Sequence, residues 1–203
     1  MGTRHLICVF KDGGYRVAQY GQFDGYPEGH GLGVLDFLTK EMDKDLFLQK
    51  LNNVSFGTEE ELHDQWQECG ADNSGLVGFD VANLHEKIYP ENSRNTGSRI
   101  LSIIQNSTKT LLLDNSLAFA GDSLFCEWAY VIDFDKNTFE VYKGFNKSPV
   151  DECERFYGLN DGIECYSGDK YYPVKLVASF DLDNLPTVKE FLNKFKDDEE
   201  DVG

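Results

Sequence analysis

Hydrophobic and polar residues follow a β-strand pattern near both ends of the chain and a helical pattern between them. At the start, two β-rich runs, residues 4–10 and 15–22, flank the turn signal Asp12-Gly13-Gly14. Aspartate and glycine readily supply the positive φ angles of a tight turn. The pattern therefore predicts an N-terminal β-hairpin.

The middle third of the chain carries apolar residues at helical spacing. Asp43 is placed to cap one helix, and Thr58 with Glu61 fits a capping box that opens another. Gly70 and Pro90 are expected to end two of the helices. The helices predicted in this way cover residues 34–42, 45–51, 58–68, 81–88 and 98–105.

Beyond residue 109 the β pattern returns, with strands predicted at 110–113, 126–134, 138–142 and 174–180. Thr187 and Glu190 form a second capping box, which starts a final helix running to about residue 196. The long stretch 143–169 is either a surface excursion or holds a short element. These elements predict an α+β fold, with antiparallel sheets from the hairpin and the C-terminal strands around a helical middle third.

The length of the chain limits the number of domains, and its charge limits the classes of partner that it can bind. A chain of 203 residues fits one domain, expected over residues 1–196, with a disordered acidic tail at 197–203. Its formal charge of -17 disfavours binding to nucleic acid or to an anionic membrane. The apolar run at residues 6–10 is too short for a signal-peptide core, so a cytoplasmic location is expected. The oligomeric state stays open.

Cysteine and histidine spacing gives no sign of a metal site. The five cysteines are widely spaced without a Cys-x-x-Cys pair, and we expect reduced thiols. His5, His63 and His85 lie in separate predicted elements. We therefore predict neither a bound metal nor a cofactor.

The segment 22–33 joins a predicted strand to a predicted helix and is rich in glycine. Its main-chain N–H groups and the helix N-terminus suit an anionic ligand group. Arg4 starts the first strand and is a candidate second clamp for the same anion. The alternatives are that the glycines serve turns and close packing, and that Arg4 pairs with Asp24 or Glu28. The ligand-binding residues predicted are Arg4, Gln22, Tyr26, Gly29, Gly31 and Gly33.

Three residues are candidates for catalytic roles. Asp24 and His30 suit an acid and base pair, provided that they are in contact. Cys126, between aromatic residues and an acid, is the candidate nucleophile. The alternatives are a solvated His30 and a Cys126 that fills the core of a strand.

Four segments resemble an uncharacterised protein family of fungi, bacteria and phages, for which no activity is established. They are Met-Gly-Thr-Arg at 1–4, Ala-Gln-Tyr-Gly-Gln-Phe-Asp-Gly-Tyr-Pro-Glu-Gly at 18–29, Leu-Phe-Cys-Glu-Trp-Ala-Tyr at 124–130, and Asp-Lys-Asn-Thr-Phe-Glu-Val-Tyr at 135–142. The resemblance implies a shared fold and no catalytic roles. The pattern is also similar to the layered sheets of the N-terminal nucleophile hydrolases. Removal of Met1 would expose Gly2, which has no side-chain nucleophile, so that likeness implies architecture alone.

Two functional hypotheses follow. The first is binding of a small anionic or polar metabolite by Arg4 and the 22–33 loop, with hydrolysis as an activity that such a site can support. The second is a non-enzymatic, acidic interaction or inhibitor protein that engages a basic partner.

Overall fold

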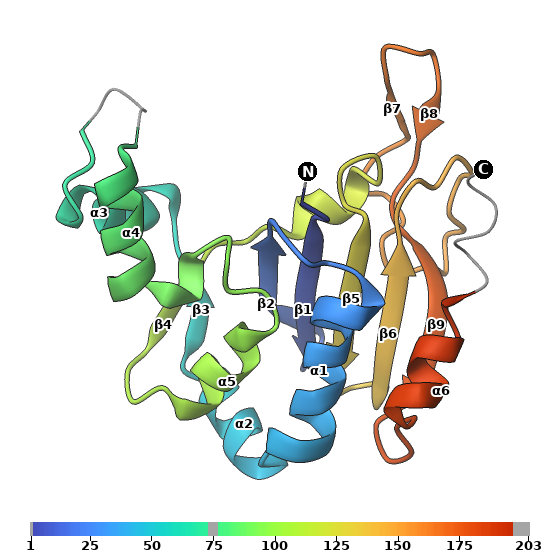
Figure 1. Cartoon of the computed structure of the whole chain (residues 1–203), viewed down its shortest axis with the longest axis horizontal. Coiled ribbons are helices and arrows are strands. Elements are labelled where there is room, and N and C mark those ends of the chain that lie inside the picture. Colours follow the sequence, from blue (N-terminus) through green and yellow to red (C-terminus); the bar gives the residue numbers. More distant parts are fainter. Residues whose placement is uncertain (1, 73–76, 197–203) are drawn as a thin grey trace.

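The computed structural model describes residues 2–72 and 77–196. A five-stranded sheet forms its centre, in the order β2-β1-β5-β6-β9 (Figure 1). The strands are β1 His5–Lys11, β2 Gly14–Gly21, β5 Trp128–Asp133, β6 Thr138–Lys143 and β9 Lys175–Asp181. With the helices around it, this sheet confirms the predicted α+β class.

The sheet is mixed. β1 and β2 form the predicted antiparallel hairpin, with Asp12 and Gly13 at positive φ in its turn. β1 also pairs in parallel with β5, with His5 opposite Trp128. This pair departs from the antiparallel sheets expected: β2 returns the chain to the edge where β1 begins, with Gly21 opposite His5, and β5 starts at that same edge and so runs parallel to β1. Only this sheet has more than two strands among the described residues, so a stacked pair of large sheets, as in the N-terminal nucleophile hydrolases, is not formed there.

Side-chain caps start three of the six α-helices of the described residues. The Asp43 carboxylate accepts a hydrogen bond from the Leu46 N–H at 3.0 Å, and both predicted capping boxes form. The helix predicted at 34–42 differs, since it is a short α-helix between two π-helical turns at 27–31 and 37–41. The helices are α1 Leu32–Asp36, α2 Lys44–Leu51, α3 Glu59–Glu68, α4 Phe79–Ile88, α5 Arg99–Asn106 and α6 Val188–Asn193.

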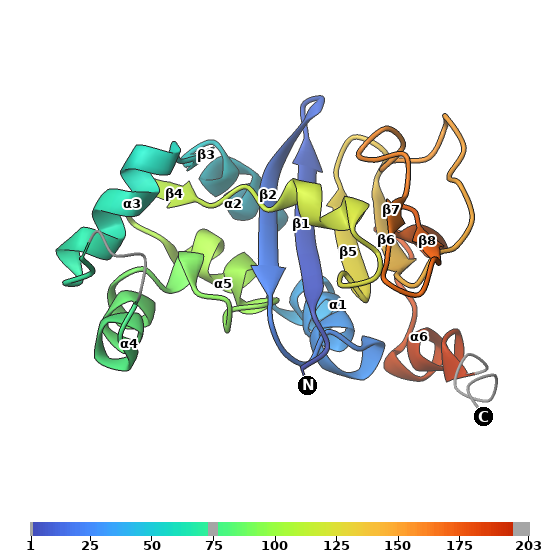
Figure 2. The same cartoon turned by 90° about the horizontal axis from the view of Figure 1, so that it is seen from above.

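The two faces of the sheet are covered differently. On one face, α1, α2, α5 and α6 pack over an apolar cluster that runs from Ile7 to Phe195 in sequence (Figure 2). On the other face, irregular segments and a 3₁₀ turn at Leu117–Gly121 cover a smaller cluster containing Cys8, Cys126 and Phe156. Successive residues of β5 point to opposite faces of the sheet and so belong in turn to the two clusters. Every residue of that strand is therefore buried.

The long segment after β6 holds a short element, as one of the two sequence-based alternatives allowed. β7 Ile163–Glu164 and β8 Lys170–Tyr171 form a small hairpin that projects beyond the sheet (Figure 1). Arg155 anchors this segment, because its guanidinium lies within hydrogen-bonding distance of the carboxylates of Asp133 and Glu140. All three side chains are almost completely buried.

α3 and α4 form an arm at the far side of β2 (Figure 1). A two-stranded parallel ribbon, β3 Val54–Phe56 with β4 Leu111–Leu113, connects this arm to the body. The sequence predicted the second of these strands and missed the first.

No helix within 2–72 or 77–196 is long and apolar enough to cross a membrane. The predicted acidic tail lies outside the described residues.

Candidate functional site

Three N–H groups of the glycine-rich loop, those of Gly29, His30 and Gly31, are already bonded within the loop. The Gly29 and Gly31 N–H groups donate to the Tyr26 carbonyl at 3.0 and 3.2 Å, and the His30 N–H donates to the Asp24 carbonyl at 2.9 Å. A Cβ on Gly31 would meet the Tyr130 ring at about 3 Å. These glycines therefore allow tight turns and close packing, the alternative that the sequence left open.

A Cβ on Gly33 would lie 2.2 Å from the Ser98 hydroxyl, so this glycine also serves close packing. His30 lies against the same serine: its Nδ1 accepts from the Ser98 N–H at 3.1 Å and lies 3.0 Å from the Ser98 Oγ. Burial lowers the pKa of His30, while Asp24 opposes this effect. The bond from the His30 N–H to the Asp24 carbonyl places these two residues next to each other, and the His30 ring lies beside a second imidazole, His5, at 4.3 Å between ring centroids.

The Tyr130 hydroxyl joins the loop to the sheet, since it donates to the Gly25 carbonyl at 2.8 Å in a fully buried position. A Tyr130→Phe variant should lower the free energy of unfolding by about 1–2 kcal/mol, because the Gly25 carbonyl loses its buried donor. Urea denaturation measures this loss. Tyr166→Phe, at a fully exposed position, is the control and should change stability by no more than about 0.5 kcal/mol. Equal losses in the two variants would contradict the anchoring role.

The side chains of Arg4 and Cys126 make their contacts away from this loop. The Arg4 Nε is 3.9 Å from a Glu127 carboxylate oxygen, and the guanidinium sits over the Phe125 ring at 4.5 Å. Neither Asp24 nor Glu28 is its ion-pair partner. Cys126 is 0% exposed, its thiol lies 3.5 Å from the Trp128 carbonyl, and burial raises its pKa. A buried, protonated thiol is a poor nucleophile.

The predicted chemical groups are also divided by the sheet. Gly31 packs against Tyr130, which belongs to the helix-covered cluster, whereas Cys126 belongs to the cluster on the other face. Asp24 and His30 therefore share one face, and the candidate nucleophile lies on the other. The geometry assembles no catalytic trio from these three residues.

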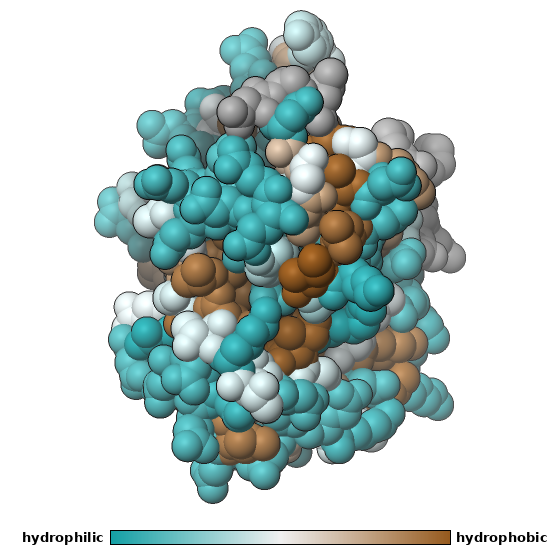
Figure 3. All heavy atoms as spheres, turned by 90° about the vertical axis from the view of Figure 1, so that its left-hand side faces the viewer, coloured by the Kyte–Doolittle hydropathy of each residue, from teal (hydrophilic) through white to brown (hydrophobic). Residues whose placement is uncertain are grey.

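Two adjoining hollows lie where the α3–α4 arm meets the body. Their volumes are about 470 and 410 Å³, within the usual range for small-molecule pockets. Figure 3 views the molecule from the side of this arm and shows apolar side chains lying between hydrophilic ones on that face. The two hollows share four lining residues, Trp66, His85, Asn92 and Arg94.

Two residues that line the larger hollow each have a buried polar atom without a hydrogen-bond partner, Gln19 Oε1 and His85 Nε2. The Gln19 side-chain N–H₂ donates to the carbonyls of Tyr20 and Ser93, both at 3.2 Å, which fixes the orientation of the amide. The His85 ring stacks on Trp66, with 3.6 Å between ring centroids. Burial lowers the pKa of His85, against a weaker effect of Glu91, so a neutral imidazole is favoured.

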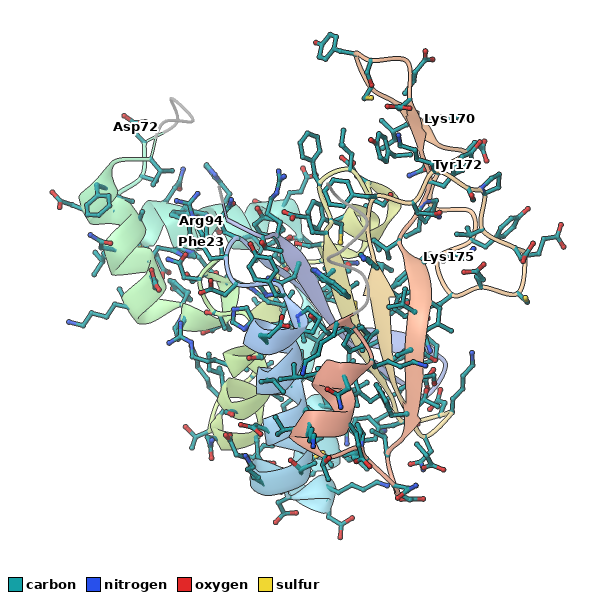
Figure 4. The ribbon with its side chains drawn as sticks, turned by 45° about the vertical axis from the view of Figure 1, so that its right-hand side comes forward. Phe23, Asp72, Arg94, Lys170, Tyr172 and Lys175 are labelled. Atoms are coloured by element: carbon teal, nitrogen blue, oxygen red, sulfur yellow. The ribbon has the colours of Figure 1, made fainter. Side chains whose placement is uncertain are left out.

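Arg94 supplies an exposed cation at both hollows. Its side chain makes no ion pair or hydrogen bond with any residue in the described ranges. Its carbonyl accepts from the Gln22 N–H at 2.9 Å, which holds this segment against the end of β2 (Figure 4). Gln22 also accepts from the Tyr20 hydroxyl at 2.5 Å. Of the predicted ligand-binding residues, Gln22 is therefore the one bonded to residues that line the hollows.

Sequence reasoning missed this cleft because its residues come from five separate segments. It treated His85 as isolated from the other histidines. One signal was available: Gln19 is a polar residue between Ala18 and Tyr20 in a strand, and it is only 4% exposed. A buried amide in an otherwise apolar strand needs partners, and here one of its atoms has none.

Comparisons with protein-family models, with curated protein sequences and with solved structures gave no match. The resemblance to the uncharacterised family stays a prediction. Within the described residues, no group of three or more His, Cys, Asp or Glu side chains is arranged to hold a metal ion.

Proposed function

We propose that the protein binds a small polar ligand with an anionic group in the cleft between the α3–α4 arm and β2. One observation carries the proposal: Gln19 and His85 line the same hollow, and each has a buried polar atom without a hydrogen-bond partner, Gln19 Oε1 and His85 Nε2. An unpaired buried polar atom costs roughly 1–3 kcal/mol, a cost that is removed if a small shift of these side chains on binding lets the ligand supply the missing hydrogen bonds. The hypothesis of a small anionic or polar metabolite is retained, and its site moves from Arg4 and the glycine-rich loop to this cleft.

Charge supports an anionic group on the ligand. Arg94 borders both hollows, and a guanidinium pairs well with carboxylate or phosphate. In a chain of net charge -17, an arginine without a carboxylate partner among the described residues is unusual. We therefore assign the anion-binding role to Arg94 in place of Arg4, which lies beside Glu127.

A thermal-unfolding screen tests the proposal. The panel consists of amino acids, hydroxy acids, sugar phosphates and nucleoside monophosphates. A ligand present at about 100 times its Kd should add about 2.7 kcal/mol of stability, which raises the midpoint of wild type by several degrees. Arg94→Ala and Gln19→Leu should lose most of this rise, because each removes a group that the ligand would contact.

Arg16→Ala is the matched control, since Arg16 lies near the other end of β2 and pairs with Asp12. It should keep the wild-type response. The proposal fails if no panel member raises the midpoint of the wild type, or if the Arg94 and Gln19 variants respond as Arg16→Ala does.

We propose no hydrolytic step at this cleft, because Asp24, His30 and Cys126 do not line it. The alternative of an acidic interaction protein stays a prediction. Exposed carboxylates on α3 and the exposed Phe79 of α4 are compatible with it. Nothing in the described residues identifies a basic partner.

A further inference from the structure

We infer that the ligand of this cleft is a free peptide of a few residues with an apolar residue at its C-terminus. This inference rests on the proposed function and specifies its ligand class. It is carried by the order of chemical groups along the two hollows: carboxylates at one end, Arg94 at the junction and an exposed aromatic ring at the other end. Such a peptide carries an ammonium group, a carboxylate and an apolar side chain, one group for each of these three places.

Arg94 lies where the two hollows meet. It lines both of them, as Trp66, His85 and Asn92 do, whereas every other lining residue belongs to one hollow alone. Its guanidinium forms no ion pair within the described ranges. A carboxylate pairs well with a guanidinium, through two parallel hydrogen bonds. The carboxylate of the ligand is therefore expected near the middle of the cleft, with other parts of the ligand in each hollow.

The larger hollow suits a positively charged group. Glu59 and Asp114 line it, and neither carboxylate pairs with a lysine, arginine or histidine in the described part of the chain. The Asp114 carboxylate accepts from the Ser116 hydroxyl at 3.2 Å, which leaves its charge uncompensated. Tyr20 and Trp66 line the same hollow, and aromatic rings attract cations. An ammonium group placed here would therefore meet two carboxylates and an aromatic surface.

The smaller hollow suits an apolar group. Phe79 and Ala82 of α4 line it, and Phe79 is 81% exposed. The Glu86 carboxylate also lines this hollow, but it already accepts from the Asn95 side-chain N–H₂ at 3.0 Å. Covering exposed aromatic surface with an apolar side chain stabilises a complex, because both surfaces leave water. We assign this hollow to the side chain of the C-terminal residue.

The size of the cleft favours a peptide over a single amino acid. Each hollow alone, at about 470 and 410 Å³, has the volume of a small-molecule pocket, so a ligand that places groups in both is larger than one amino acid. Arg94, Glu59 and Asp114 line the larger hollow together without forming an ion pair. A ligand that carries both charges can bridge them. In an extended peptide each residue adds roughly 3.3–3.6 Å between the ammonium group and the carboxylate.

Isothermal titration calorimetry of the wild-type chain tests this inference. The probe is the tripeptide Gly-Gly-Phe. Its C-terminal amide lacks the carboxylate, its N-acetyl form lacks the ammonium group, and Gly-Gly-Gly lacks the apolar side chain. We expect Gly-Gly-Phe to bind about tenfold or more tightly than each of these three peptides.

Substitutions in the cleft match the three groups of the peptide. Arg94→Gln should weaken the binding of Gly-Gly-Phe to the wild-type level for the amide. Glu59→Gln combined with Asp114→Asn should weaken it to the level for the N-acetyl form, and Phe79→Ala to the level for Gly-Gly-Gly. Glu60→Gln is the matched control, because Glu60 is exposed on α3 and lines neither hollow, and it should bind as the wild type does.

The inference is overturned if Gly-Gly-Phe does not bind, if it binds no more tightly than the three comparison peptides, or if Glu60→Gln weakens binding as much as the paired substitution. Equal binding of the N-acetyl form would assign the cleft to the C-terminus of a protein, and would also overturn it. In each case an Arg94-dependent response to a hydroxy acid or a sugar phosphate in the thermal screen would leave the proposed function standing. Absence of any ligand response in both experiments would remove both.

Discussion

An Arg155→Met variant should lower the free energy of unfolding by about 3–5 kcal/mol, the cost of removing one partner of a buried ion pair. The guanidinium binds Glu140 through two nitrogens, at 2.6 and 3.0 Å, and also contacts Asp133. Burial alone would raise the pKa of Glu140, but hydrogen bonds from Arg155 and Tyr142 hold it below its ordinary value. Without the arginine, two buried carboxylates remain uncompensated. Urea denaturation at pH 7 measures the loss.

Lys147→Met is the matched control for this prediction. Lys147 lies in the same segment and pairs with Asp169, but both side chains are largely exposed. Its substitution should cost no more than about 1 kcal/mol, because surface ion pairs contribute little. If Arg155→Met costs no more than Lys147→Met, the buried network does not anchor the segment after β6.

The second large effect is acid destabilisation through His5. This ring is 0% exposed, and neither of its nitrogens has a hydrogen-bond partner. Burial, and to a smaller extent the neighbouring His30, lowers the pKa of His5 to about 3. Between about pH 6.5 and pH 3 the unfolded chain therefore holds a proton that the folded chain does not. The free energy of unfolding falls by about 1.4 kcal/mol per pH unit across this window, in total by about 5 kcal/mol.

The measurement compares the wild type with His5→Leu by urea denaturation at pH 7 and pH 5, above the range in which most carboxylates titrate. The wild type should lose about 2 kcal/mol more than His5→Leu between these two values. His63→Leu, which removes an imidazole from an exposed position on α3, should keep the wild-type loss. Equal pH dependence of the wild type and His5→Leu would show that the buried ring takes up its proton at an ordinary pH.

The sequence predicted correctly the turns and helix caps that depend on interactions between residues close together in the chain. The Asp12-Gly13 turn, the Asp43 cap and the two capping boxes all appear where they were expected. Each depends on residues within four positions of one another, so the sequence contains the whole interaction. The parallel pairing of β1 with β5 and the short β3 strand depend on distant partners, and no local pattern encodes them.

The candidate site was less predictable for the same reason. The sequence indicated a glycine-rich loop, but it could not show that the N–H groups of this loop bond to the carbonyls of Asp24 and Tyr26. The cleft proposed here combines Gln19, Trp66, His85 and Arg94, which meet only after the arm docks beside β2. An unsatisfied buried atom is a property of the packed structure, and the amino-acid pattern at Gln19 gave only a hint of it.

The parallel contact at the centre of the sheet also constrains when this protein can fold. Arg4 and Glu127, which bond to each other at the start of that contact, are 123 positions apart. At about 5–20 residues per second, a ribosome delivers β5 roughly 6–25 s after β1. Until then β1 has only β2 beside it, and an isolated hairpin is marginal in water. Nascent chains should therefore expose the apolar side chains of β1 for seconds, which makes the first strand the segment most in need of a chaperone during synthesis.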